Sequence, residues 1–117
     1  MNADTRSIEQ HFAKSSPDVR AIYDRILSAA GKWGPVEQDP KKTSIHLNRG
    51  TAFAGVATRK DALILTVKST TDIESKRISK HERASANRWH LEIRLAEPNE
   101  VDRYLLRWLR ASYDMSD

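Results

Sequence analysis

The sequence predicts an α+β fold: a two-layer sandwich in which two main helices pack on one face of an antiparallel sheet of four to five strands. Apolar residues recur with a period of about 3.6 over residues 17–30, then with a period of about 2, and again with the helical period after Asn99. The turns at 48–50 and 59–61 are too short for crossovers, so the strands that they join pair antiparallel. Two helices of this length cover only one face of the sheet, which predicts two layers.

The first main helix is predicted over residues 17–30. Ser16, Pro17 and Asp18 supply an N-cap residue, a first-turn proline and a first-turn acid, and Gly31 stands where a C-cap glycine is common. Its apolar stripe consists of Val19, Ile22, Ile26, Leu27 and Ala30.

The middle of the chain predicts strands joined by tight turns. A first short strand starts at Val36 and ends before Pro40, and residues 69–87 are predicted as a long loop with a helical turn near 73–79. The other strands alternate between apolar and polar side chains, and they cover residues 43–48, 51–58, 62–68 and 89–95.

A second main helix closes the chain. Asn99 followed by Asp102 resembles a capping box, with Asp in place of the usual Glu. The inward stripe of this helix consists of Val101, Leu105, Trp108, Leu109 and Ser112. The face of the sheet that the helices leave uncovered is expected to be polar. Its predicted occupants are Ser44, His46, Thr66, Lys68, His90, Glu92 and Arg94.

Length and composition limit the classes of protein. The 117 residues predict an N-terminal arm or short helix over 1–15 and a single α+β domain over 16–117. The absence of Cys excludes disulfides, thiolate zinc sites and cysteine nucleophiles, and it suits a reducing cytoplasm. No apolar run approaches the ~20 residues of a membrane span, so we expect no membrane association and a cytoplasmic location.

Positive charge is concentrated in the middle of the chain. Residues 41–88 contain 11 Lys and Arg against 4 Asp and Glu, whereas the rest of the chain contains 9 against 12. Clustered positive charge attracts polyanions, and long side chains in loops suit phosphate contacts. The alternative is a solvated loop whose charges serve solubility alone. The candidate polyanion-binding residues are Lys41, Lys42, Arg59, Lys60, Lys76, Arg77, Lys80, Arg83 and Arg88.

A second candidate site is a pocket for a small anionic ligand, where the long loop meets the last strand. Its candidate residues are His46, Ser85, Asn87, His90 and Glu92. Two imidazoles and a carboxylate also resemble a metal or acid–base set. In a simple meander, however, the two histidines lie roughly 14 Å apart, too far to share one ion. We therefore predict no metal site, no cofactor and no catalytic residue.

Seven segments together resemble a known family. They are WGPVE at 33–37, KTSIHL at 42–47, FAGV at 53–56, RK at 59–60, SANRWH at 85–90, LRWL at 106–109 and ASY at 111–113. Over residues 17–115 they resemble the bacterial domain-of-unknown-function 5655 family, which implies one compact domain and no established activity. More distantly, the pattern is similar to small MmcQ/YjbR-type proteins, whose α/β fold has been likened to double-wing DNA-binding modules. Likeness of fold does not transfer function.

Three interpretations of function follow. The first is a non-enzymatic cytoplasmic binding module whose basic loop contacts nucleic acid or another polyanion. The second is a small anionic-ligand-binding or enzymatic domain that uses the junction at 87–92 together with His46. The third is a protein-interaction domain that forms a homodimer. Salt dependence of binding, ligand-dependent thermal stability and concentration-dependent mass distinguish the three.

Overall fold

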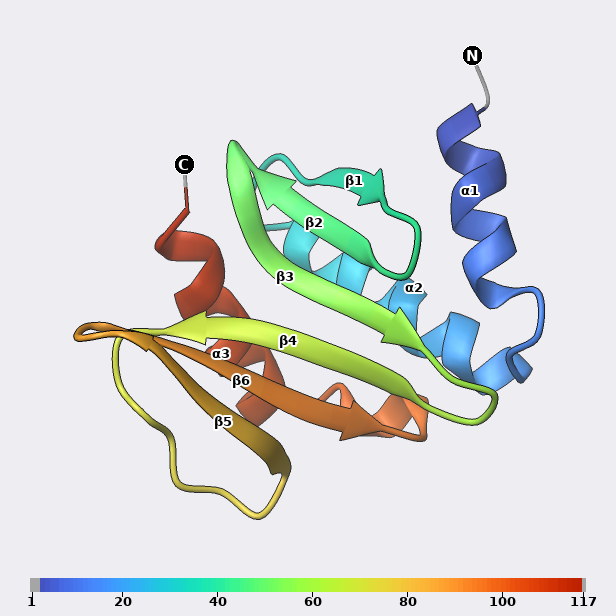
Figure 1. The fold of residues 1–117 in the computed structure, drawn as a ribbon. Helices are drawn as coiled ribbons and strands as arrows, with labels where there is room; N and C mark the ends of the chain where they lie inside the picture. The colour runs from blue at the N-terminus through green and yellow to red at the C-terminus, as the bar shows by residue number, and fades with distance from the viewer. Residues whose placement is uncertain (1–2, 117) are drawn as a thin grey trace.

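In the computed structural model, which describes residues 3–116 and their side chains from Ile8 onwards, three helices accompany one six-stranded sheet (Figure 1). The helices are α1 (Ala3–Phe12), α2 (Pro17–Gly31) and α3 (Arg103–Asp114), and the 3₁₀ turn η1 (Pro98–Glu100) precedes α3. The strands are β1 (Glu37–Pro40), β2 (Ile45–Arg49), β3 (Thr51–Thr58), β4 (Leu63–Ser69), β5 (Ile78–Ser85) and β6 (Arg88–Leu95).

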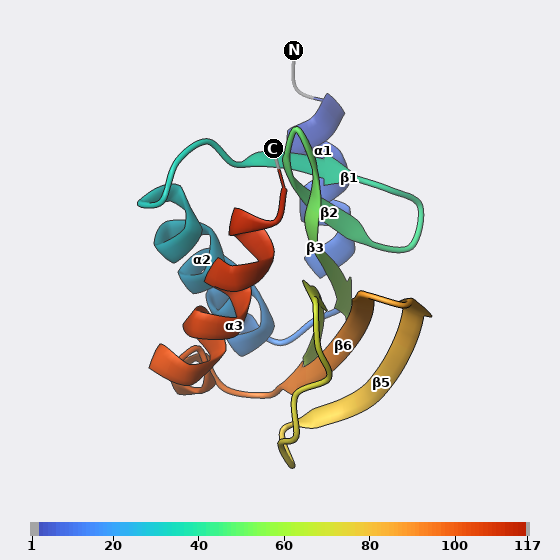
Figure 2. The same cartoon turned by 90° about the vertical axis from the view of Figure 1, so that its left-hand side faces the viewer.

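The sheet is antiparallel throughout, and its strands lie in the order β1-β2-β3-β4-β6-β5. Helices α2 and α3 lie side by side on one face, and the opposite face is uncovered (Figures 1 and 2). This confirms the α+β class and the arrangement of the two main helices. The sheet has six strands rather than four to five, and the N-terminal segment forms a third helix, α1. Phe12 anchors this helix, with its ring 5.0 Å from that of Tyr23 on α2.

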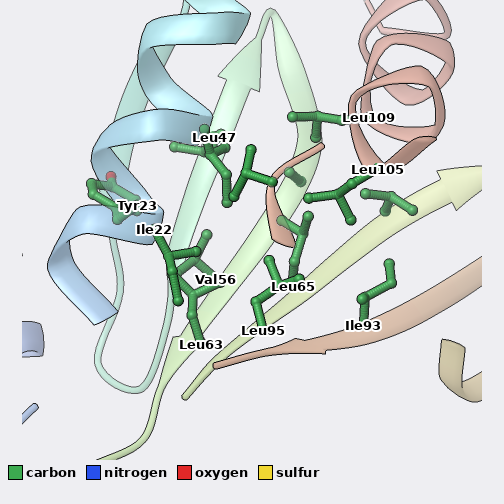
Figure 3. Packing of buried hydrophobic residues seen from close by; sticks show 14 of the residues in the cluster. Ile22, Tyr23, Leu47, Val56, Leu63, Leu65, Ile93, Leu95, Leu105 and Leu109 are labelled. Atoms are coloured by element: carbon green, nitrogen blue, oxygen red, sulfur yellow. The ribbon is translucent and has the colours of Figure 1, made fainter. Parts of the chain in front are cut away.

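The hydrophobic core lies between the sheet and the two main helices. Leucines and isoleucines at alternate positions of the strands point toward α2 and α3, as the period of two predicts (Figure 3). From the helices, Ile22 and Tyr23 of α2 and Leu105 and Leu109 of α3 meet them, all four fully buried. Packing on one face only leaves the other face of the same strands for polar side chains.

Strand β5 lies within the segment that the sequence predicts as a loop with a helical turn. Its residues pair with β6 from Ile78 to Ser85 and form one edge of the sheet. Only Ile78 is buried and the other residues of β5 are exposed, so the strand lacks the apolar alternation that marks a strand in a sequence. Charged side chains are common on such edges because they discourage pairing with other chains.

The start of α3 also differs from the expectation. Asp102, not Asn99, is the N-cap, and its carboxylate accepts a hydrogen bond from the Leu105 amide at 3.0 Å. The capping box belongs to η1 and joins Glu97 with Glu100. Pro98 explains why the capping box begins at Glu97 and not at Asn99. Proline favours the first helical position, so Pro98 starts η1 and the residue before it is the N-cap.

Candidate functional site

The uncovered face of the sheet contains a hollow where β3 and β4 part. The two strands pair from Thr58 and Leu63 as far as Ala54 and Val67, and from there β3 pairs only with β2 and β4 only with β6. A β-bulge bends β3 at this point, since Leu47 faces Ala54 while its neighbour faces Ala52. Figure 1 shows the resulting V between the two strands.

Helix α3 closes the V from the covered side through Ser112, which is fully buried. Its hydroxyl donates a hydrogen bond to the Phe53 carbonyl and accepts one from the Lys68 amide at 2.9 Å. These are backbone groups of β3 and β4 at the point where the strands no longer pair. The serine thus replaces a ladder bond and holds the V at a fixed opening.

The hollow has a volume of about 520 Å³ and lies between β2 on one side and β6 on the other. Small residues of β3, among them Ala52, Gly55 and Ala57, form its floor. The connection between β1 and β2 and the turn between β5 and β6 both project on this side of the sheet (Figure 2). The side chains that bring polar groups to the hollow are Ser44, His46, Thr66, Lys68, Arg88 and His90.

The charge of the hollow is positive. Among the described residues, those that line it include Lys68 and Arg88 but no Asp or Glu. Neither cation has an ion-pair partner among the side chains of residues 8–116. The Nε of Arg88 is buried and, within the same part of the chain, meets no hydrogen-bond acceptor. An unpaired buried donor of this kind destabilises the fold, by about 1–3 kcal/mol in typical cases.

Lys68 and Arg88 also affect each other. Burial lowers the pKa of the Lys68 ammonium, and the nearby charge of Arg88 lowers that pKa further. The folded protein therefore holds the Lys68 proton less tightly than an unfolded chain does. A bound anion between the two side chains would stabilise both positive charges and raise the pKa of Lys68 again.

The structure brings together two of the five residues of the predicted ligand pocket. His46 and His90 line the hollow from opposite sides. Ser85 and Asn87 lie exposed at the turn between β5 and β6, and Glu92 lies on the uncovered face opposite Thr66 without lining the hollow. His90 approaches a different carboxylate, with its Nδ1 3.7 Å from Glu82 Oε1.

The predicted polyanion-binding residues lie at separate places. Lys41, Lys42, Arg59 and Lys60 surround the C-terminal end of α1, whereas Arg88 lines the hollow. The remaining four are on or next to β5: Lys76, Arg77, Lys80 and Arg83.

Two of the four cations near β5 have structural partners. Arg77 Nη1 lies 3.0 Å from both carboxylate oxygens of Asp102, and Nη2 donates to the Glu100 carbonyl at 2.6 Å. Arg83 donates to the carbonyls of its own turn and lies over the Trp89 ring. Lys76 lines a separate hollow that also contains acidic residues, Asp72 and Glu74. The basic segment is therefore not one continuous cationic loop.

Lys68 and Thr66 are functional candidates that the sequence placed on the uncovered face but not in a site. The period-two pattern identifies the face on which a side chain lies, and it does not tell which residues of that face share a hollow. Among the side chains of residues 8–116, no group of three or more His, Asp or Glu is close enough to hold a metal ion. None of the helices described here is both long and apolar enough to cross a membrane.

Comparison with models of known families gives a match over most of the chain. The model of the domain of unknown function DUF5655 matches residues 8–116. The chain belongs to the DUF5655 family. No curated protein and no solved structure matches it, and the similarity to MmcQ/YjbR-type proteins is not confirmed. The DUF5655 match includes every residue that lines the hollow, so the hollow lies within the family domain.

Proposed function

We propose that this DUF5655 domain is a binding module for a small organic anion, which occupies the hollow on the uncovered face of the sheet. The proposal is carried by the pair of cations, Lys68 and Arg88, that line this hollow. None of the described residues that line it carries a carboxylate. Two neighbouring cations that lack a partner cost stability in the free protein. An anionic group would pair with both, and it would give the buried Nε of Arg88 an acceptor.

The other lining residues suggest what kind of anion fits. Hydroxyls of Ser44 and Thr66 and the imidazoles of His46 and His90 add hydrogen-bonding groups around the cations. The floor of small residues leaves room beside the anionic group for an apolar or ring-shaped body. A volume of about 520 Å³ is within the usual range for small-molecule sites, roughly 300–1,000 Å³. A phosphate or carboxylate on a compact organic body matches these features.

The substitution Lys68→Met should change the stability of the free protein and its affinity for an anion in opposite directions. Because the pKa of Lys68 is lowered, its charge destabilises the folded state at neutral pH. That penalty is complete below the lowered pKa and disappears as the pH rises past the unfolded value of about 10.4. We expect Lys68→Met to raise the melting temperature in the absence of anion. We also expect it to weaken binding of phenyl phosphate by about tenfold to a hundredfold, the range for losing one charge-assisted hydrogen bond.

Calorimetric titration with phenyl phosphate, inorganic phosphate and uncharged phenol is the measurement. Lys80→Met is the matched control, since Lys80 is an exposed residue of β5 that does not line the hollow. Binding of phenyl phosphate but not of phenol, weakened in Lys68→Met and unchanged in Lys80→Met, supports the proposal. Equal binding by both variants, or no anion binding by the wild type, would exclude the hollow as an anion site.

A further inference from the structure

A second cationic surface lies at the C-terminal end of α1. Two adjoining hollows there share Gln10 and His11 in their linings. Lysines and an arginine reach them from the α1–α2 connection, the β1–β2 connection and the β3–β4 turn. We call this the α1-end surface, and its cations are Lys14, Lys41, Lys42, Arg59 and Lys60.

Hydrogen bonds to the backbone fix the three segments against one another. His11 Nε2 is 2.8 Å from the Lys41 carbonyl, and the Thr58 hydroxyl donates to the His11 carbonyl at 2.6 Å. The Ser15 hydroxyl donates to the Arg59 carbonyl at 2.8 Å. These hydrogen bonds hold the backbone of the three segments in place, while the five cationic side chains remain exposed to solvent.

Nearby carboxylates neutralise only a small part of the positive charge of the α1-end surface. Among the described residues, the linings of both hollows contain no Asp or Glu, and of the five cations only Lys41 forms an ion pair, with Asp39 at 2.9 Å. A helix C-terminus carries roughly half a negative charge, which favours a cation there but offsets only a small part of five. Most of the cationic charge is thus available to a partner.

We propose that the α1-end surface binds the phosphodiester backbone of a nucleic acid. Cations from three chain segments, with Gln10, Ser15 and Thr58 between them, suit contacts to successive phosphates. The described residues of the lining include no Phe, Tyr or Trp, and Ala13 and Pro40 are the only apolar ones among them. Protein partners usually anchor in apolar or aromatic pockets, and single-strand binders stack bases on aromatic rings, so these features favour backbone contacts to a duplex.

The test is fluorescence anisotropy of a labelled DNA duplex over a series of salt concentrations. If about four cations contact phosphates, the logarithm of the association constant falls with the logarithm of salt with a slope near −3.6. The double substitution Lys42→Ala with Lys60→Ala removes two of these contacts. We expect it to weaken binding at least tenfold at low salt and to make the slope less steep by about 1.8.

The matched control is the double substitution Lys76→Ala with Lys80→Ala, which removes the same charge next to β5. This control and Lys68→Met should bind DNA like the wild type, so the outcome does not depend on the anion site in the hollow on the uncovered face of the sheet. An equal loss in the β5 control would show a diffuse charge effect and overturn the proposal. Failure of the wild type to bind DNA, or tighter binding of a labelled poly-glutamate peptide than of the duplex, would overturn it as well.

Discussion

Ser112 is the residue that most directly shapes the candidate site, although it does not line it. Its hydroxyl bonds to β3 and β4 where the two strands part, and it is fully buried. A smaller or apolar residue at this position would leave an amide and a carbonyl without partners in a buried place. The opening of the hollow thus depends on one hydroxyl on the opposite face of the sheet.

Replacing that hydroxyl should therefore destabilise the fold. We expect Ser112→Ala to lower the free energy of unfolding by about 1–3 kcal/mol, because the Phe53 carbonyl and the Lys68 amide lose their partner. Urea denaturation at neutral pH measures the loss. Ser28→Ala, at an exposed position of α2, is the control and should change stability by less than about 0.5 kcal/mol. A Ser112→Ala loss as small as that of the control would contradict the bridging role.

Side-chain direction was predictable at this scale, whereas side-chain partners were not. Alternation along the strands placed His46, Thr66, Lys68 and His90 on the uncovered face, and the structure confirms this. The helical stripe likewise placed Ser112 toward the sheet. Its hydrogen bonds depend on where β3 and β4 stop pairing, and a bulge opposite β2 determines that point. No local pattern in the sequence reports such a bulge.

At the scale of the elements, hydrogen bonds tie the N-terminus of α3 to the segment before β5. Asp102 accepts from the Leu105 amide and from Arg77, which links the start of α3 to the segment before β5. The Leu105 amide, and then the Arg77 guanidinium, lower the pKa of the Asp102 carboxyl. This carboxyl therefore stabilises the fold above its unfolded pKa of about 3.9, and the contribution is lost as the pH falls through the lower folded value.

Two substitutions separate the cap from the ion pair. Asp102→Ala should cost about 1–2 kcal/mol at neutral pH, since the helix loses its N-cap. Asp102→Asn should cost less, because Asn caps as well as Asp and only the charge opposite Arg77 is lost. Urea denaturation at neutral pH and near pH 3 should show the difference between wild type and Asp102→Asn shrinking at the lower pH. A constant difference would contradict the assigned role of the charge.

Most elements that the sequence predicted have a buried face; the exception is β1, which has no buried residue. Helix α2 and strands β2, β3, β4 and β6 carry apolar residues at the required spacing and are present with slightly different ends. Strand β5 lacks this pattern because all but its first residue are exposed at a sheet edge. Its pairing depends on backbone hydrogen bonds to β6, which side-chain periodicity does not record.

For the whole molecule, the two-layer plan follows from the order of the elements, but the hollow does not. In a flat sheet His46 and His90 would lie on opposite sides of β3 and β4 with no space enclosed between them. A hollow forms here because β3 parts from β4 and because the β1–β2 connection and the β5–β6 turn project on the uncovered side of the sheet. The parting of the strands and the direction of the hairpins result from the bulge, the twist of the sheet and the packing of α3. The site therefore forms only when the whole domain is folded.

The most direct measurement is an amide ¹H–¹⁵N NMR titration of the assigned protein with phenyl phosphate. An anion site in the hollow on the uncovered face predicts that the largest shift changes fall on amides of Gly55, Thr66, Lys68, Arg88 and His90. It also predicts that Lys68→Met moves these changes to about tenfold to hundredfold higher phenyl phosphate concentrations. Amides near Lys76 and Lys80, which do not line the hollow, should move little and serve as the internal reference. Shift changes confined to that reference region, or spread evenly over all cationic surfaces, would contradict an anion site in the hollow on the uncovered face of the sheet.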